Sequence, residues 1–72
     1  MDSKQAIEKM CGVAGKSQRT VSSEIGRNPT FIGTTLSKGS VPRVDTMSKI
    51  AEACGFELVL RGYGVTIELG GD

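Results

Sequence analysis

Apolar residues recur every three or four positions in four segments of this chain, the spacing that places them on one face of a helix. A glycine follows each segment, at positions 15, 26, 39 and 55, and glycine commonly ends a helix. We therefore expect four helices, and their apolar faces are, in chain order, Ile7, Met10, Cys11 and Ala14; Val21 and Ile25; Ile32 and Leu36; and Val44, Met47, Ile50, Ala51 and Cys54.

After Gly55 the apolar residues alternate with polar ones, which is the period of a strand. Residues 61–64 contain two glycines and separate two such segments, so we expect a β-hairpin and a frayed tail at residues 70–72. An isolated hairpin is marginal in water. Its apolar residues must therefore cap the helices or contact another molecule. The candidates for a dimer interface are Phe56, Leu58, Leu60, Val65, Ile67 and Leu69.

The second and third expected helices lie close together in the segment 17–39. Ser17 is a candidate N-cap, Gly26 ends the second helix, and Asn28 with Pro29 provides an N-cap and a first helical residue for the third. Ser22 is small where the two helices would cross. The remaining face of the third helix carries Thr30, Gly33, Thr34 and Ser37, which are small residues without an acidic side chain. Such a face suits contact with phosphates and base edges, although an ordinary αα-hairpin has a similar pattern.

Seventy-two residues form one domain, and a chain of this size is marginally stable alone. Its two cysteines lie on apolar helix faces and we expect no secretion signal, so we also expect reduced core thiols in a soluble cytoplasmic protein without a membrane span. No histidine is available for a zinc site. With no metal, cofactor or disulfide expected, dimerisation is the remaining source of stability.

The net charge of +1 conceals an uneven distribution. Residues 16–43 carry five basic side chains and one acidic one, whereas residues 44–72 carry two basic and five acidic side chains. The positive charge thus surrounds the segment 17–39, where it favours a polyanionic partner. A solvated basic face without a partner is the alternative.

The sequence Gly15-Lys16-Ser17 matches the end of a phosphate-binding loop, but the pattern also requires a glycine where this chain has Met10. A strand should precede that loop, whereas the preceding segment is helical in pattern. We therefore expect a helix end and a basic linker residue here. The chain also lacks a carboxylate pair or an activated nucleophile at plausible spacing, so we expect no enzymatic activity.

Residues 17–55 resemble the helix-turn-helix domains of phage repressors of the Cro and lambda-repressor type, also called the XRE type. The matching residues are Ser17-Gln18, Val21-Ser22, Ile25-Gly26, Ile32, Gly39, Pro42 and the segment Ile50 to Phe56. The resemblance implies a mainly α, four-helix lambda-repressor-like domain over residues 1–55, with its motif at 17–39. The C-terminal hairpin, residues 56–72, would be the dimerisation element of the same domain.

What the resemblance implies is a sequence-specific regulator of transcription, usually a repressor, that binds a palindromic double-stranded DNA operator as a homodimer. The candidates for base contacts are Asn28, Pro29, Thr30, Phe31 and Thr34. The candidates for phosphate contacts are Gln18, Arg19, Ser37, Lys38, Ser40 and Arg43. The chain departs from the family pattern at Pro29, Gly33 and Thr34, where longer or more polar side chains are usual.

The residues also indicate which bases are preferred. Threonine offers a hydroxyl and a methyl group, and no arginine lies on this helix face to bind guanine, so we expect an operator rich in A·T pairs. Phe31 either closes the core or stacks against DNA, and Arg43 either binds phosphate, enters a minor groove or is merely solvated. The main alternative function is an antitoxin that represses its own operon and binds a protein partner through the hairpin. Non-specific nucleic-acid binding fits a near-neutral chain poorly.

Overall fold

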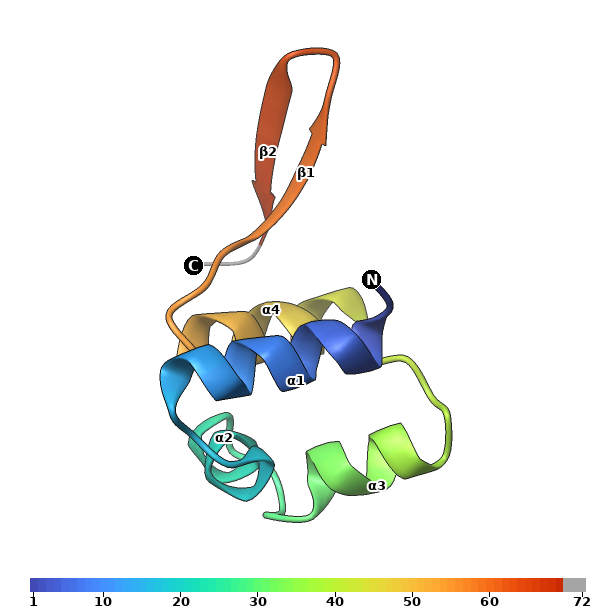
Figure 1. The fold of residues 1–72 in the computed structure, drawn as a ribbon, viewed down its shortest axis with the longest axis vertical. Coiled ribbons are helices and arrows are strands. Elements are labelled where there is room, and N and C mark those ends of the chain that lie inside the picture. Colours follow the sequence, from blue (N-terminus) through green and yellow to red (C-terminus); the bar gives the residue numbers. More distant parts are fainter. Residues whose placement is uncertain (70–72) are drawn as a thin grey trace.

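The computed structural model describes residues 1–69, and the tail expected at residues 70–72 lies outside them. It contains helices α1 (Ser3–Ala14), α2 (Gln18–Glu24), α3 (Phe31–Ser37) and α4 (Val44–Ala53), followed by strands β1 (Leu58–Gly62) and β2 (Val65–Leu69). The expected mainly α chain with a terminal hairpin is therefore confirmed. In Figure 1 the hairpin projects from one end of the helical body, and α2 and α3 lie at the opposite end.

Local sequence signals explain where α1 begins and ends. The Asp2 carboxylate accepts a hydrogen bond from the backbone N–H of Gln5 at 2.8 Å, and the Gln5 side chain accepts one from the backbone N–H of Asp2 at 3.1 Å. This reciprocal pair satisfies two of the N–H groups that a helix start leaves without partners. Gly15 ends the helix with a φ of 68°. Gly26, Gly39 and Gly55 likewise have positive φ, so all four expected helix ends are confirmed.

The core is formed by one aliphatic residue from each helix. Ile7, Val21, Ile32 and Ile50 come from α1, α2, α3 and α4, and each is at most 1% exposed. Because each helix contributes one of these side chains, removing any of them would leave a cavity in a core that all four helices build. The hydrophobic core thus links the orientations of α2 and α3 to the positions of α1 and α4.

Cys11 and Cys54 extend this core at the C-terminal ends of α1 and α4. Both are free thiols and both are buried, as expected. Burial, followed by the neighbouring Cys54 thiol, raises the pKa of Cys11 to about 11. The Cys11 thiol therefore stays protonated at neutral pH, and the reactive thiolate form is scarce.

The start of α4 differs from the sequence expectation. Val44 was assigned to the buried face but is 61% exposed, while Thr46 and Ser48 are buried. Val44 is the first residue of the helix and lines the space beneath the hairpin, so it lies beyond the helical core. The hydroxyl of Ser48 donates a hydrogen bond to the backbone carbonyl of Leu69 at 3.3 Å. This bond attaches the end of β2 to α4.

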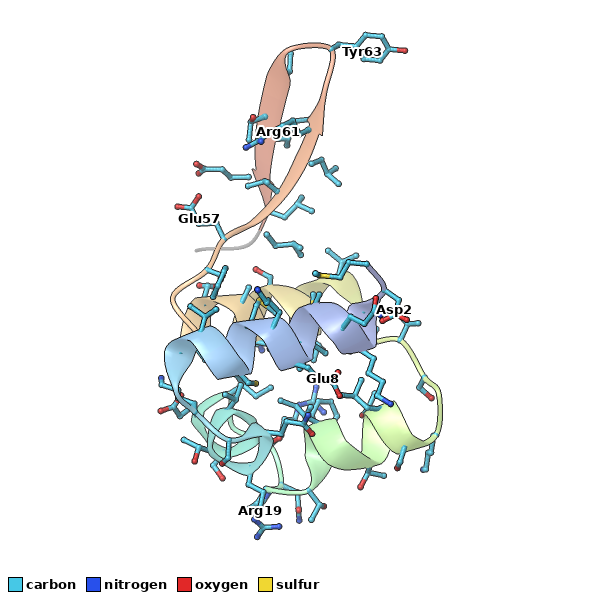
Figure 2. All side chains as sticks on the ribbon, in the orientation of Figure 1. Asp2, Glu8, Arg19, Glu57, Arg61 and Tyr63 are labelled. Atoms are coloured by element: carbon cyan, nitrogen blue, oxygen red, sulfur yellow. The ribbon has the colours of Figure 1, made fainter. Side chains whose placement is uncertain are left out.

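The hairpin is antiparallel, with Leu58 opposite Leu69 and Leu60 opposite Ile67. The turn is shorter than the expected four residues, because only Tyr63 and Gly64 lie between the strands, at φ of 51° and 72°. Two successive residues of positive φ match the twist of a tight hairpin. Tyr63 stands at the exposed tip (Figure 2). Within residues 1–69, the helices are too short or too polar to traverse a bilayer.

Candidate nucleic-acid interface

Helix α3 begins later than the sequence suggests, because a separate turn lies between it and α2. Asn28 and Pro29 were expected as N-cap and first helical residue, but α3 begins at Phe31 with Thr30 as its N-cap. The Asn28 side-chain oxygen instead accepts hydrogen bonds from the N–H of Thr30 at 2.9 Å and from its hydroxyl at 2.8 Å. Asparagine favours such local bonds two residues ahead. They stabilise a separate turn before the helix.

Ser22 joins α2 to α3 at the point where they cross. Its side chain is fully buried. The hydroxyl donates to the carbonyl of Gln18 at 2.7 Å and accepts from the N–H of Ile32 at 3.1 Å. That N–H lies in the first turn of α3, where a helix has no partner of its own for it. Ser22 therefore does more than permit close approach, because its hydroxyl supplies the hydrogen bond that α3 lacks.

The residues expected on the outer face of this helix pair are indeed exposed. Thr30, Gly33, Thr34 and Ser37 are exposed, as are Asn28, Pro29 and Arg19. A shallow hollow of about 260 Å³ lies between α2 and α3, and its lining contains no acidic residue. The residues that the structure gathers around it are Gln18, Arg19, Pro29, Thr30, Gly33, Thr34 and Ser37. In Figure 2 Arg19 extends outward at the end of the molecule farthest from the hairpin.

The remaining phosphate candidates lie beyond this hollow. Lys38, Ser40 and Arg43 are exposed and follow α3 along the chain, and none of them lines the hollow. The Nε of Arg43 is 3.5 Å from a carboxylate oxygen of Asp45, but both side chains are largely exposed. An ion pair so open to solvent contributes little and is readily exchanged for another partner. These residues therefore lie outside the hollow, on the exposed segment that follows α3.

Phe31 packs against the helical core and is half-buried. The guanidinium carbon of Arg27 lies 4.8 Å from the centre of its ring. Of the two roles considered for Phe31, the structure thus favours the one in the core. No role was expected for Arg27, although an arginine four residues before an aromatic residue was a usable sign of this contact.

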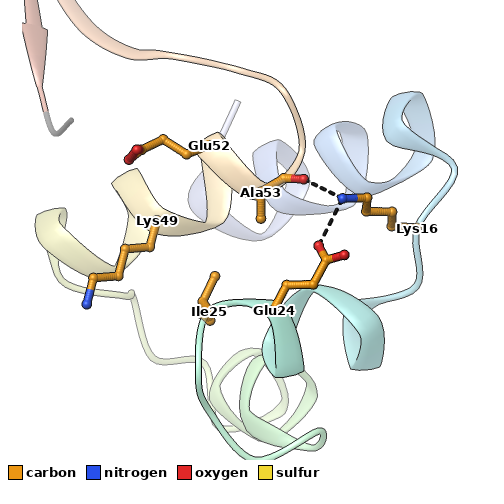
Figure 3. A pocket seen from close by; sticks show the side chains of 6 residues that line it. All are labelled: Lys16, Glu24, Ile25, Lys49, Glu52 and Ala53. Carbon is orange, nitrogen blue, oxygen red and sulfur yellow. Dashed lines mark hydrogen bonds and ion pairs between the residues drawn. The ribbon is translucent and has the colours of Figure 1, made fainter. Parts of the chain in front are cut away.

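Lys16 neutralises the only acidic side chain of residues 16–43 (Figure 3). Its ammonium group lies 2.9 Å from a Glu24 carboxylate oxygen and donates to the backbone carbonyl of Ala53 at 2.7 Å. A cation at that carbonyl is favourable because it lies at the negative end of the α4 dipole. Lys16 therefore holds α2 against the end of α4. The positive charge left for a partner resides on Arg19, Arg27, Lys38 and Arg43.

A second surface lies beneath the hairpin and is apolar. A groove of about 380 Å³ separates the hairpin base from α1 and α4, and Leu58, Leu69, Met10, Val44 and Met47 contribute to its lining. The hairpin face continues it, because Leu60, Val65 and Ile67 are 55%, 54% and 52% exposed. We call the groove and these three residues the apolar surface. Phe56 is excluded from it because it packs against the helical core.

Comparison of the chain with protein-family models, with curated proteins and with solved structures finds no match. The two surfaces are therefore assessed by their chemistry. One is polar, free of acidic side chains and flanked by cations; the other is apolar and lies near the opposite end of the molecule.

The Ser22 hydroxyl should contribute measurably to stability. Ser22→Ala leaves the buried N–H of Ile32 without a partner, which we expect to lower the free energy of unfolding by about 1–3 kcal/mol. Ser23→Ala is the matched control, because Ser23 is the next residue of α2 and is exposed. Urea unfolding followed by circular dichroism measures both variants. Equal stabilities for the two variants would contradict the role of the Ser22–Ile32 hydrogen bond.

Proposed function

We propose that the chain is a sequence-specific, non-enzymatic regulator of transcription, a repressor that binds a palindromic operator as a homodimer in the cytoplasm. In this proposal α2 and α3 form a helix-turn-helix of the lambda-repressor type, and α3 enters the major groove. The observation that carries the proposal is the exposed outer face of α3, which has no acidic side chain and is held by Ser22 at a defined angle to α2.

The hydrogen bonds within the chain refine the expected base contacts. The Asn28 oxygen is occupied by Thr30, so Asn28 has only its amide hydrogens to offer and lacks the acceptor needed for a bidentate bond to adenine. The Thr30 hydroxyl donates to Asn28, which leaves its lone pairs and its methyl group for DNA. Thr34 makes no side-chain hydrogen bond within residues 1–69, so it is the side chain best able to bind a base edge.

The charges around α3 support backbone contacts. Arg19 and Gln18 lie on one side of the hollow, and Lys38 and Arg43 lie beyond the C-terminal end of α3. Contacts from both sides would fix the position of α3 along the groove without reading sequence. Because Lys16 pairs with Glu24, the other charged side chains of residues 16–43 are all basic, even though the whole chain is close to neutral.

The apolar surface supports a homodimer. Exposed aliphatic patches of this kind commonly mark a protein contact. A two-fold pairing of hairpins with its axis along the long dimension of the molecule would leave both copies of α3 facing the same duplex (Figure 1). Two recognition helices in such dimers lie about 34 Å apart, one turn of DNA. The antitoxin alternative assigns the same surface to a different protein.

The DNA proposal is tested by selecting bound sequences from random duplexes at two salt concentrations. We expect a palindrome with A·T pairs at the centre of each half-site, and an affinity that falls steeply as salt rises. On the selected duplex, Thr34→Ala should weaken binding by about 1–3 kcal/mol and relax one base position. No enrichment, or half-sites with G·C pairs alone, would contradict the proposal.

Lysine variants separate backbone contacts from base contacts in the same assay. Lys38→Ala should weaken binding to all sequences alike and reduce the salt slope by about one unit. Lys49→Ala removes the same charge from α4 and should leave affinity near that of the wild-type chain. An equal effect of the two variants would show that overall charge, and not position beside α3, determines the affinity.

The proposed dimer is tested by substitutions in the hairpin. Ile67→Glu places a carboxylate within the apolar surface and should convert the dimer to a monomer in sedimentation equilibrium, without loss of helix content. Thr66→Glu is the control, since successive strand residues point to opposite faces and Thr66 pairs with Arg61. A wild-type monomer at micromolar concentration, or a dimer that survives Ile67→Glu, would favour the protein-partner alternative.

A further inference from the structure

We propose that Gly33 is a specificity-determining residue, whose bare Cα receives the methyl group of one thymine when α3 lies in the major groove. The inference rests on the proposed DNA binding and adds to it a position and a chemical group. A glycine at this position lowers the stability of the helix, because glycine is the least favourable residue after proline in a helix interior. Gly33 is the third residue of the seven-residue helix α3.

The fold itself does not require a glycine at this position. Gly33 has helical backbone angles, unlike Gly26 and Gly39 on either side of α3, whose φ values of 81° and 72° favour glycine. A Cβ added at Gly33 would meet only the side-chain oxygen of Gln18, at 3.9 Å, which is an ordinary van der Waals distance. Alanine would therefore fit the isolated chain and would strengthen the helix.

The space that a Cβ would occupy belongs to the candidate interface. Gly33 lines the hollow of about 260 Å³ together with Gln18, Arg19, Thr30 and Thr34. A methyl group on Gly33 would stand in this hollow, next to the Gln18 amide that the proposal assigns to a phosphate. The amide makes no side-chain hydrogen bond within residues 1–69. The absent Cβ therefore matters chiefly to a molecule that approaches from outside.

The chemistry around Gly33 indicates which group approaches. The threonines on this face offer methyl groups and single hydroxyls, and the Gly33 Cα adds a small apolar surface between them. No side chain of α3 provides the paired donors that bind guanine. A thymine C5-methyl is the apolar group that projects into the major groove, and the bare Cα of Gly33 leaves room for it beside the threonine methyl groups.

The test removes one methyl group from the DNA and adds one to the protein. The DNA change uses a set of duplexes in which deoxyuridine replaces one thymidine of the selected operator at a time. At one position the wild-type chain should lose about fourfold in affinity, the contribution of one methyl group. Gly33→Ala should bind the thymine duplex about 5- to 150-fold more weakly, because its added methyl group overpacks the contact, and it should recover affinity on the duplex that carries uracil at that position. Gly33→Ala should also melt roughly 4–8 °C higher than the wild-type chain.

Gly12→Ala is the matched control, because Gly12 lies within α1 and an added Cβ would meet nothing within 4 Å. It should raise the melting temperature without changing DNA affinity. The inference would be overturned if no uracil substitution lowered the affinity of the wild-type chain. It would also be overturned if Gly33→Ala bound the thymine duplex as tightly as the wild-type chain does. Either result would leave the proposed function intact. Failure of the wild-type chain to select any duplex would instead overturn both.

Discussion

The hydrogen bond between the Ser22 hydroxyl and the N–H of Ile32 is the constraint on which the arrangement of α2 and α3 depends. It satisfies a donor that α3 cannot satisfy itself, and it does so from within the core, at a side chain with no exposed surface. A larger residue at this crossing would separate the helices, and a small apolar one would leave the N–H without a partner. The same hydroxyl also donates to Gln18, so the helix that carries Arg19 is joined to the helix that carries Thr34.

The surrounding interactions distribute charge and apolar surface to opposite ends of the molecule. Lys16 compensates the charge of Glu24 and holds α2 against α4. Ser48 attaches the hairpin to the other side of α4 through the carbonyl of Leu69. A helix of ten residues thus separates a polar surface without acidic side chains from an apolar one.

The elements of this fold could be predicted from local sequence, because their signals lie within one turn or one strand pair. Gly15 and Gly55 mark helix ends, and the alternation around Leu60 and Ile67 marks a hairpin. The start of α3 was misplaced because Asn28 and Pro29 favour both a helix start and a preceding turn, and the bonds to Thr30 decide between them. The Ser22–Ile32 bond joins residues ten apart and has no periodic signature. Exposure of Val44 likewise follows from its place in the first turn of α4, beside the groove beneath the hairpin, which the helical period does not show.

The central claim is that the outer face of α3 contacts the edges of a DNA duplex. The most direct measurement is a titration of the isotopically labelled chain with its selected duplex, followed through backbone amide signals. The account predicts that the largest changes fall on residues 28–37 and on Gln18 and Arg19, with the hairpin residues 58–69 little altered. Changes confined to the hairpin and the groove, with the signals of α3 unmoved, would contradict it.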